Sequence, residues 1–189
     1  MLYSELQCSE AIHKAVERMG FAEMTEIQEK TIPVMMAGHD VIAKAPTGTG
    51  KTCAFGIPVA EHIQPENKYP QAVIMAPTRE LAQQIAEELT QLTYFMPEVQ
   101  VACVYGGANM EKQAKRLAEG CQIVVATPGR LMDHYKHHSI DISHVTQIVL
   151  DEADEMLNMG FYKDVRHIIE MMKARKSLSM FSATISREV

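Results

Sequence analysis

Short, almost continuous apolar runs alternate along the chain with longer stretches in which apolar residues recur every three or four positions. The runs span residues 41–43, 72–76, 99–105, 123–126, 148–150 and 178–183. They are rich in Val and Ile and contain few polar residues, as in strands that are buried on both faces of a sheet. The pattern therefore predicts six buried strands.

The stretches between the runs have helical periodicity. Leu81, Ile85, Leu89 and Leu92 follow one another at spacings of four, four and three, which predicts one apolar stripe on a helix that begins near Thr78. A second stripe runs from Phe161 to Met172. Strands that alternate with such helices predict right-handed crossovers and a three-layer α/β/α fold with a mostly parallel sheet.

The chain shows no linker, so we expect residues 1–189 to form a single domain. Residues 1–38 are helical in pattern and contain no apolar run of the strand type. They are therefore expected to be a helical preamble packed on the edge of the core.

A glycine-rich segment directly follows the first run. It reads A-P-T-G-T-G-K-T and consists of Ala45, Pro46, Thr47, Gly48, Thr49, Gly50, Lys51 and Thr52. Glycines let backbone N–H groups turn inward around phosphate oxygens, Lys51 supplies a charge for the β and γ phosphates, and Thr52 supplies a hydroxyl for Mg²⁺. The segment predicts a P-loop NTPase; the alternative is a Gly-rich turn that carries Lys and Thr by chance.

Two acidic residues follow the run at 148–150. A P-loop enzyme needs a carboxylate at the end of a neighbouring strand to hold the Mg²⁺ shell, and Asp151 has that position. Glu152 comes next and is the natural base or orienting group for the attacking water. The alternative is an exposed acidic turn that starts a helix at Asp154.

The nucleotide base is less clearly specified. Guanine-specific P-loop proteins usually carry N-K-x-D, and the Asn67-Lys68 pair here lacks the Asp. The Gln28 amide has the donor and acceptor that pair with N6 and N7 of adenine. By spacing alone, Gln28 is either an adenine reader or a solvated helix residue.

Three more turns at strand ends have features of phosphate sites. Residues 77–81 and 127–131 each contain an Arg, with Thr78 and Thr127 as expected helix N-caps and Pro128 in a first turn. The glycine pair 106–107 forms the third. One nucleotide does not need so many phosphate-binding turns, whereas the phosphates of a polymer backbone would use them. The alternative is that these segments are ordinary helix caps and turns.

Charge and composition limit the partners. The 18 basic and 24 acidic residues give a net charge of −6, spread along the chain, so nucleic acid would be held by a few placed groups. Without an aromatic and basic stripe, backbone recognition with little sequence preference is expected. No apolar run approaches the ~20 residues of a membrane span and no signal peptide is evident. The four cysteines form no C-x-x-C pair, which favours reduced thiols in the cytoplasm.

Two polar clusters are interpreted as solvated surface. The histidines at 134, 137, 138 and 144 have no Cys or carboxylate at tetrahedral spacing, so a metal site is disfavoured. Glu87 and Glu88 are read as an exposed acidic helix face.

Taken together, the motifs resemble the N-terminal RecA-like domain of DEAD-box ATP-dependent RNA helicases over essentially the whole chain. The ordered matches are residues 20–28 (Q motif), 45–52 (motif I), 77–81 (Ia), 106–107 (GG), 127–130 (Ib), 151–154 (II) and 182–184 (III).

The resemblance implies a role for each matching residue. Thr25 and Gln28 belong to the adenine-reading Q motif, and Tyr3 takes the place of an aromatic against adenine. RNA-backbone contacts are implied for Pro77, Thr78, Arg79, Gly106, Gly107, Thr127, Pro128, Gly129 and Arg130. Ser182 and Thr184 are similar to the motif that couples hydrolysis to duplex opening, through a hydrogen bond to Asp154. The implied ligands are ATP or ADP, Mg²⁺ and RNA.

Two departures from the family pattern matter. Met24 stands where the family usually has Pro, which is expected to loosen the loop before Gln28 and weaken nucleotide binding. The family's second RecA-like domain, with the arginines that complete the ATP site, is not in this chain. We therefore expect a monomer that binds adenine nucleotide with negligible hydrolysis. The competing interpretations are a small-molecule kinase, for which no Arg-rich lid is visible, and a nucleotide-gated RNA-binding module.

Overall fold

Six parallel strands form one sheet in the computed structural model, which describes residues 1–46 and 48–189. The strand order is β1-β6-β5-β2-β4-β3. The strands are β1 (Ile42–Lys44), β2 (Ala72–Met75), β3 (Val101–Val104), β4 (Ile123–Ala126), β5 (Gln147–Asp151) and β6 (Ser177–Ser182). Each predicted apolar run is a strand, and the predicted parallel sheet is confirmed.

The helices fill the stretches between the strands. They are η1 (Tyr3–Glu5), α1 (Glu10–Arg18), α2 (Glu26–Met36), α3 (Lys51–Glu61), α4 (Arg79–Leu92), α5 (Met110–Ala118), α6 (Pro128–Lys136), α7 (Ala153–Asn158) and α8 (Tyr162–Met171). The Thr78 side chain caps α4 by accepting from the N–H of Leu81, as the sequence predicts. No helix in the described part of the chain is both long enough and apolar enough to cross a membrane.

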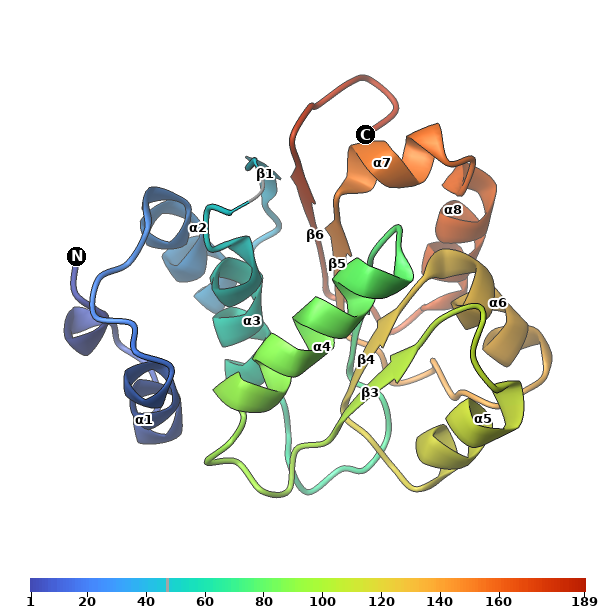
Figure 1. Cartoon of the computed structure of the whole chain (residues 1–189), viewed down its shortest axis with the longest axis horizontal. Coiled ribbons are helices and arrows are strands. Elements are labelled where there is room, and N and C mark those ends of the chain that lie inside the picture. Colours follow the sequence, from blue (N-terminus) through green and yellow to red (C-terminus); the bar gives the residue numbers. More distant parts are fainter. Residues whose placement is uncertain (47) are drawn as a thin grey trace.

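Alternate residues of β2–β6 point into two separate cores, whereas β1 buries only Ala43 and leaves Ile42 61% exposed, against the prediction that all six strands are buried. On β2, Ile74 packs in a cluster with residues of α1–α4, whereas Val73 and Met75 pack in a cluster with residues of α5–α8. Figure 1 shows α1–α3 on one side of the sheet and α6–α8 on the other. Because β2 and β4 are buried along their whole length, their sequences are continuously apolar instead of alternating; β5 is also fully buried but is apolar only between Gln147 and Asp151. The three-layer prediction is therefore confirmed.

The segment before α2 is held more firmly than the sequence suggested. The Tyr3 N–H donates to Ala22 O at 3.0 Å, and the Met24 N–H donates to Met1 O at 2.9 Å. A proline at 24 could not make the second bond, since it has no N–H. The Met24 N–H bond is thus a restraint that the sequence did not suggest, while the expected weakening of nucleotide binding stays a prediction.

Six of the seven motifs lie where the strands end, at one side of the sheet; the seventh, at residues 20–28, precedes β1. Because the strands are parallel, their carboxyl ends share an edge, and the segments after β1, β2, β3, β4 and β5 begin there. The strand β6 ends at the same edge with Ser182. This arrangement brings together residues that are far apart in sequence.

Candidate functional site

The loop between β1 and α3 has the backbone form that a phosphate site needs. Gly50 is the N-cap of α3 in a left-handed conformation, with φ +77° and ψ +25°, and Gly48 also has a positive φ of +84°. Residues other than glycine rarely adopt such values. The Thr49 hydroxyl donates to Pro46 O at 2.7 Å and braces the loop. Thr47, which the sequence also assigned to this site, lies outside the described residues.

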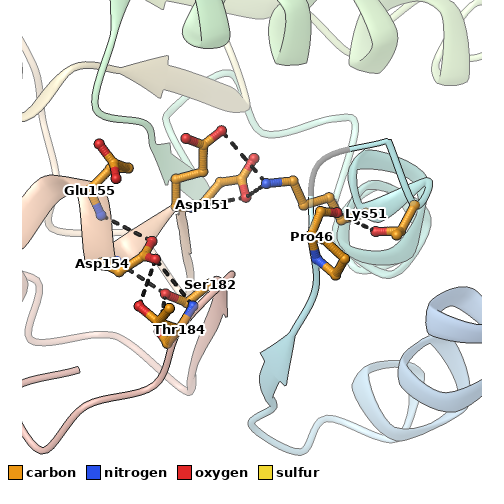
Figure 2. Close-up of polar contacts among 9 residues, drawn as sticks. Pro46, Lys51, Asp151, Asp154, Glu155, Ser182 and Thr184 are labelled. Atoms are coloured by element: carbon orange, nitrogen blue, oxygen red, sulfur yellow. Dashed lines mark hydrogen bonds and ion pairs between the residues drawn. The ribbon is translucent and has the colours of Figure 1, made fainter.

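A buried ion pair joins this loop to the end of β5. Lys51 Nζ lies 3.0 Å from Asp151 Oδ1 and 3.7 Å from Glu152 Oε2 (Figure 2). Asp151 is fully buried, and burial raises the pKa of its carboxyl group against the opposing effect of the Lys51 ammonium. The structure thus brings residues 51, 151 and 152 together, although β5 is not the direct neighbour of β1 that the sequence suggested, because β6 lies between them. Their roles in catalysis stay predictions.

One oxygen of Asp151 indicates what else could bind there. Asp151 Oδ1 accepts the N–H of Glu152 at 3.0 Å, whereas Oδ2 is buried and has no hydrogen-bond partner among the described residues. A buried carboxylate oxygen without a donor is costly, and a cation would satisfy it. In the described part of the chain, no three His, Cys, Asp or Glu side chains form a metal cluster. The residues therefore fit Mg²⁺ held through water and phosphate oxygens, the usual mode for that ion.

Glu152 has a strained backbone. Its φ and ψ are +53° and +52°, and it is the N-cap of α7. A non-glycine residue in this region costs about 1–3 kcal/mol, and such residues cluster at active sites. Its side chain is partly exposed, so the carboxylate is open to a bound ligand. The alternative interpretation of 151–154 as an ordinary exposed acidic turn does not fit a fully buried Asp151.

A second polar cluster links α7 to the end of β6. Asp154 Oδ2 accepts the Thr184 hydroxyl at 2.9 Å and the Thr184 N–H at 3.1 Å, while the Asp154 N–H donates to Ser182 Oγ at 3.1 Å (Figure 2). Burial raises the pKa of Asp154, but hydrogen bonds from Thr184 and Ser182 outweigh it and leave the pKa below its usual value. The expected hydrogen bond between Asp154 and the 182–184 segment is present.

Gln28 is bonded to the phosphate loop. Its Nε2 donates to Gly50 O at 2.9 Å, and its Oε1 accepts the Thr25 N–H at 3.0 Å and also the Tyr3 hydroxyl. Thr25 Oγ1 donates to Thr49 O at 2.8 Å. Gln28 is 3% exposed, so the alternative of a solvated helix residue is wrong.

The adenine contacts stay predictions, because the side chains in question are occupied with one another. The Gln28 amide faces protein groups on both of its ends. Tyr3 is buried, burial raises the pKa of its hydroxyl, and its ring stacks on Phe21 with centroids 6.4 Å apart. An adenine that met either side chain would have to displace these contacts.

The turn after β3 lies beside an exposed arginine. A Cβ at Gly107, where φ is +83°, would be 3.8 Å from Arg79 Nη1, and the Arg79 guanidinium lies 4.8 Å from the centre of the Tyr105 ring. The N–H groups of Gly106 and Gly107 donate to none of the described residues. This turn therefore presents free donors and a cation together.

The segment after β4 differs from the prediction in two details. Thr127 is at the N-cap of α6, but its side chain makes no capping hydrogen bond; Pro128 is in the first turn as predicted. Arg130 is bound to the protein, since its Nη1 donates to Ala108 O and to Gln113 Oε1, both at 3.0 Å.

Two residues that were interpreted as solvated surface are not. His134 is fully buried on α6, where Nε2 lies 3.1 Å from Gln113 Oε1. Glu88 is partly buried; burial raises the pKa of its carboxyl group, and the nearby Thr52 hydroxyl opposes the rise. A signal existed for both: Glu88 is three positions after Ile85 in the apolar stripe of α4, and His134 is three after the buried Leu131.

Comparisons with known proteins point in one direction. Residues 25–189 match a family model described as DEAD/DEAH box helicase. The ATP-dependent RNA helicase CshA of Limosilactobacillus reuteri is 49% identical over 189 residues, which is 100% of this chain and 38% of that protein. CshA of Listeria monocytogenes is 49% identical over 183 residues, 97% of this chain and 35% of that protein.

Solved structures give the same result. A DEAD box protein from the hyperthermophile Methanococcus jannaschii superposes with a TM-score of 0.91 at 41% identity, over 100% of this chain and 51% of that one. A hypothetical ATP-dependent RNA helicase from Sulfolobus tokodaii gives a TM-score of 0.88 at 40% identity, over 95% and 52%. This chain spans less than two fifths of the curated relatives named above and about half of these solved chains.

Proposed function

The chain belongs to the DEAD/DEAH box helicase family, and from that premise we propose that it is the ATP-binding RecA-like half of an RNA helicase. The main support for the proposal is the ion pairing of Lys51 with Asp151 and Glu152 at the carboxyl ends of the strands. Asp151 Oδ2 has no hydrogen-bond partner there among the described residues. These are the groups that a nucleoside triphosphate and its Mg²⁺ require.

Nucleotide binding is an exchange of partners in this proposal. Lys51 leaves Asp151 and pairs with the β and γ phosphates. The glycines of the loop let the backbone N–H groups turn toward these phosphates. Thr52 and Asp151 would hold Mg²⁺, largely through water, and the ion would supply positive charge that neutralises the phosphates. Glu152 orients the attacking water and accepts its proton. Gln28 and Tyr3 release each other to contact adenine.

RNA is proposed to lie along the same edge of the sheet, held by its sugar-phosphate backbone. The support is the free N–H groups of the 106–107 turn beside the exposed Arg79. Residues 77–79 and 127–130 extend this surface, with little sequence preference expected because phosphates carry no sequence information. The bonds of Asp154 with Ser182 and Thr184 would transmit the state of the nucleotide to duplex opening.

This chain alone is proposed to bind nucleotide as a monomer and to hydrolyse it very slowly. In related phosphoryl-transfer systems, an arginine supplied from outside the P-loop unit is worth about 10³–10⁵ in rate. The intact helicase would obtain its arginines from a second RecA-like domain.

The test is calorimetric titration of the chain with Mg-ADP and separately with Mg-GDP, together with an ATPase assay with and without RNA. Binding of ADP with little GDP binding is the expected result, and Lys51→Met should abolish it. Equal binding of the two nucleotides would remove the adenine-reading role of Gln28. Robust RNA-stimulated turnover would overturn the proposal that the chain is inactive alone, and the absence of any nucleotide binding would overturn the site.

A further inference from the structure

We propose that Gln113 is a positioning residue for RNA binding, because its side-chain amide ties the 106–107 turn to Arg130. The inference rests on the proposed RNA surface and adds to it a residue outside every motif used above. Gln113 lies on α5 and is 8% exposed, so it is not itself an RNA contact.

Three hydrogen bonds converge on this amide. Its Nε2 donates to Tyr105 O at 3.0 Å, and its Oε1 faces Arg130 Nη1 at 3.0 Å and His134 Nε2 at 3.1 Å. The partners fix the orientation of the amide, since a guanidinium only donates and a carbonyl only accepts. They also fix the tautomer of His134, which must carry its proton on Nε2. Burial lowers the pKa of His134, which keeps this neutral form.

The network holds the turn at both of its ends. Gln113 holds Tyr105 O at the end of β3, and Arg130 holds Ala108 O at 3.0 Å just before α5. The two restrained carbonyls flank Gly106 and Gly107, whose N–H groups donate to none of the described residues. The connection from β3 to α5 passes beside α6, which carries Arg130 and His134 (Figure 1).

Arg130 acts on RNA chiefly through this turn. Its side chain is 13% exposed, its Nη1 is shared between two protein acceptors, and its Nε is 3.7 Å from Asp133 Oδ2. Arg79, by contrast, is exposed beside Gly107 and is the cation that meets phosphate. Without Gln113, Arg130 loses an acceptor and Tyr105 O loses its donor, so the spacing between Arg79 and the free N–H groups is no longer fixed.

A matched pair of substitutions separates this role from general stability. Gln113→Leu removes a buried amide with three hydrogen bonds. Gln122→Leu removes another buried amide with three hydrogen bonds. Its Oε1 accepts the Gln100 N–H at 2.8 Å, and its Nε2 donates to two backbone carbonyls at 2.9 Å. Gln122 lies at the amino end of β4, away from the carboxyl ends of the strands. Three quantities are measured on each: amide hydrogen exchange at 105–109 without RNA, affinity for a fluorescent oligouridylate, and affinity for Mg-ADP.

For Gln113→Leu we expect faster exchange at 105–109, RNA affinity reduced about tenfold, and Mg-ADP affinity within about twofold of the wild type. Gln122→Leu should leave all three near wild type. If Gln113→Leu does not fold, Gln113→Glu replaces it: the carboxylate keeps an acceptor for Arg130 and His134 but opposes the Tyr105 carbonyl, and the same changes are expected.

Several results would overturn the inference. Equal losses of RNA affinity in the 113 and 122 variants would reduce Gln113 to a stabilising residue. Faster exchange with unchanged RNA affinity would show that the turn does not need positioning. Wild-type protein that binds Mg-ADP but no RNA would refute the proposed RNA surface, and the role of Gln113 with it. Wild-type RNA binding that survives unchanged in both 113 variants would refute the inference alone.

Discussion

Gly50→Ala tests the contact between the Q motif and the phosphate loop. A Cβ at Gly50 would lie 2.5 Å from Gln28 Nε2, so the amide must move and give up its bond to Gly50 O. Gln28 is 3% exposed and water cannot replace that partner. Gly38→Ala is the matched control, since Gly38 has a similar φ of +87° but nothing within 4 Å of an added Cβ.

Both substitutions force an alanine into a left-handed conformation, but only Gly50→Ala also displaces the Gln28 amide. Alanine in the left-handed region costs about 1–2 kcal/mol at either position. The stranded amide of Gln28 adds about 1–3 kcal/mol at Gly50 only. We therefore expect the free energy of unfolding to fall by at least about 1 kcal/mol more for Gly50→Ala, equivalent to a further 2–4 °C in Tm for a chain of this size. Urea unfolding without nucleotide measures the difference.

A double-mutant cycle completes the test. In a Gln28→Ala background, the cost of Gly50→Ala should fall by about 1–3 kcal/mol, the share of the displaced amide, because the backbone cost and the contacts with Thr25 at 3.2–3.3 Å are common to both backgrounds. Equal destabilisation by the Gly38 and Gly50 substitutions, or an undiminished cost in the Gln28→Ala background, would refute the reasoning.

Three other predictions follow from the polar clusters. Burial lowers the pKa of His134, so the stability that neutral His134 contributes is complete above the ordinary pKa of about 6.5 and is lost as the pH falls through the folded-state pKa. His134→Gln should remove this part of the pH dependence of stability, which urea unfolding at successive pH values measures. Parallel pH profiles for the variant and the wild type would contradict the prediction. Thr184→Val should raise the pKa of Asp154 in a carboxyl NMR titration, because it removes the hydroxyl bond of 2.9 Å; an unchanged pKa would count against the described cluster. Arg79→Ala should weaken RNA binding evenly across sequences and reduce the salt slope by about one, and a sequence-dependent loss would argue for base contacts instead.

The strands were predictable because a sheet buried on both faces leaves a simple signal. A strand such as β4, Ile123–Ala126, has no solvent face, so its sequence is continuously apolar and its limits can be read directly. The phosphate loop was predictable for a similar reason, since positive φ at Gly48 and Gly50 restricts those positions to glycine. Residues whose identity is restricted by burial or by backbone conformation can therefore be recognised from the sequence.

The role of Gln113 could not be predicted, and the helical spacing of His134 from Leu131 indicated its burial but not its partner, because the partners of both residues come from other elements of the fold. Both are polar residues on amphipathic helices, and only the side-chain contact between α5 and α6 shows that they satisfy one another. Gln28 is a related case: its spacing was compatible with a solvated residue until the structure brought it to Gly50 O. A buried polar group is recognised by its partners, which come from other parts of the chain.

The pairing of β1 has a consequence for how the protein forms during synthesis. The strand β1, which leads into the phosphate loop, is an outermost strand of the sheet and, among the described residues, pairs only with β6, so that Ile42 is opposite Met180. A nascent chain still on the ribosome before residue 177 has not yet made the partner of β1. Strand pairings between such distant residues form late, because they must first close a long loop. The nucleotide site should therefore be assembled near the end of translation of this segment, although its loop is among the first parts to emerge.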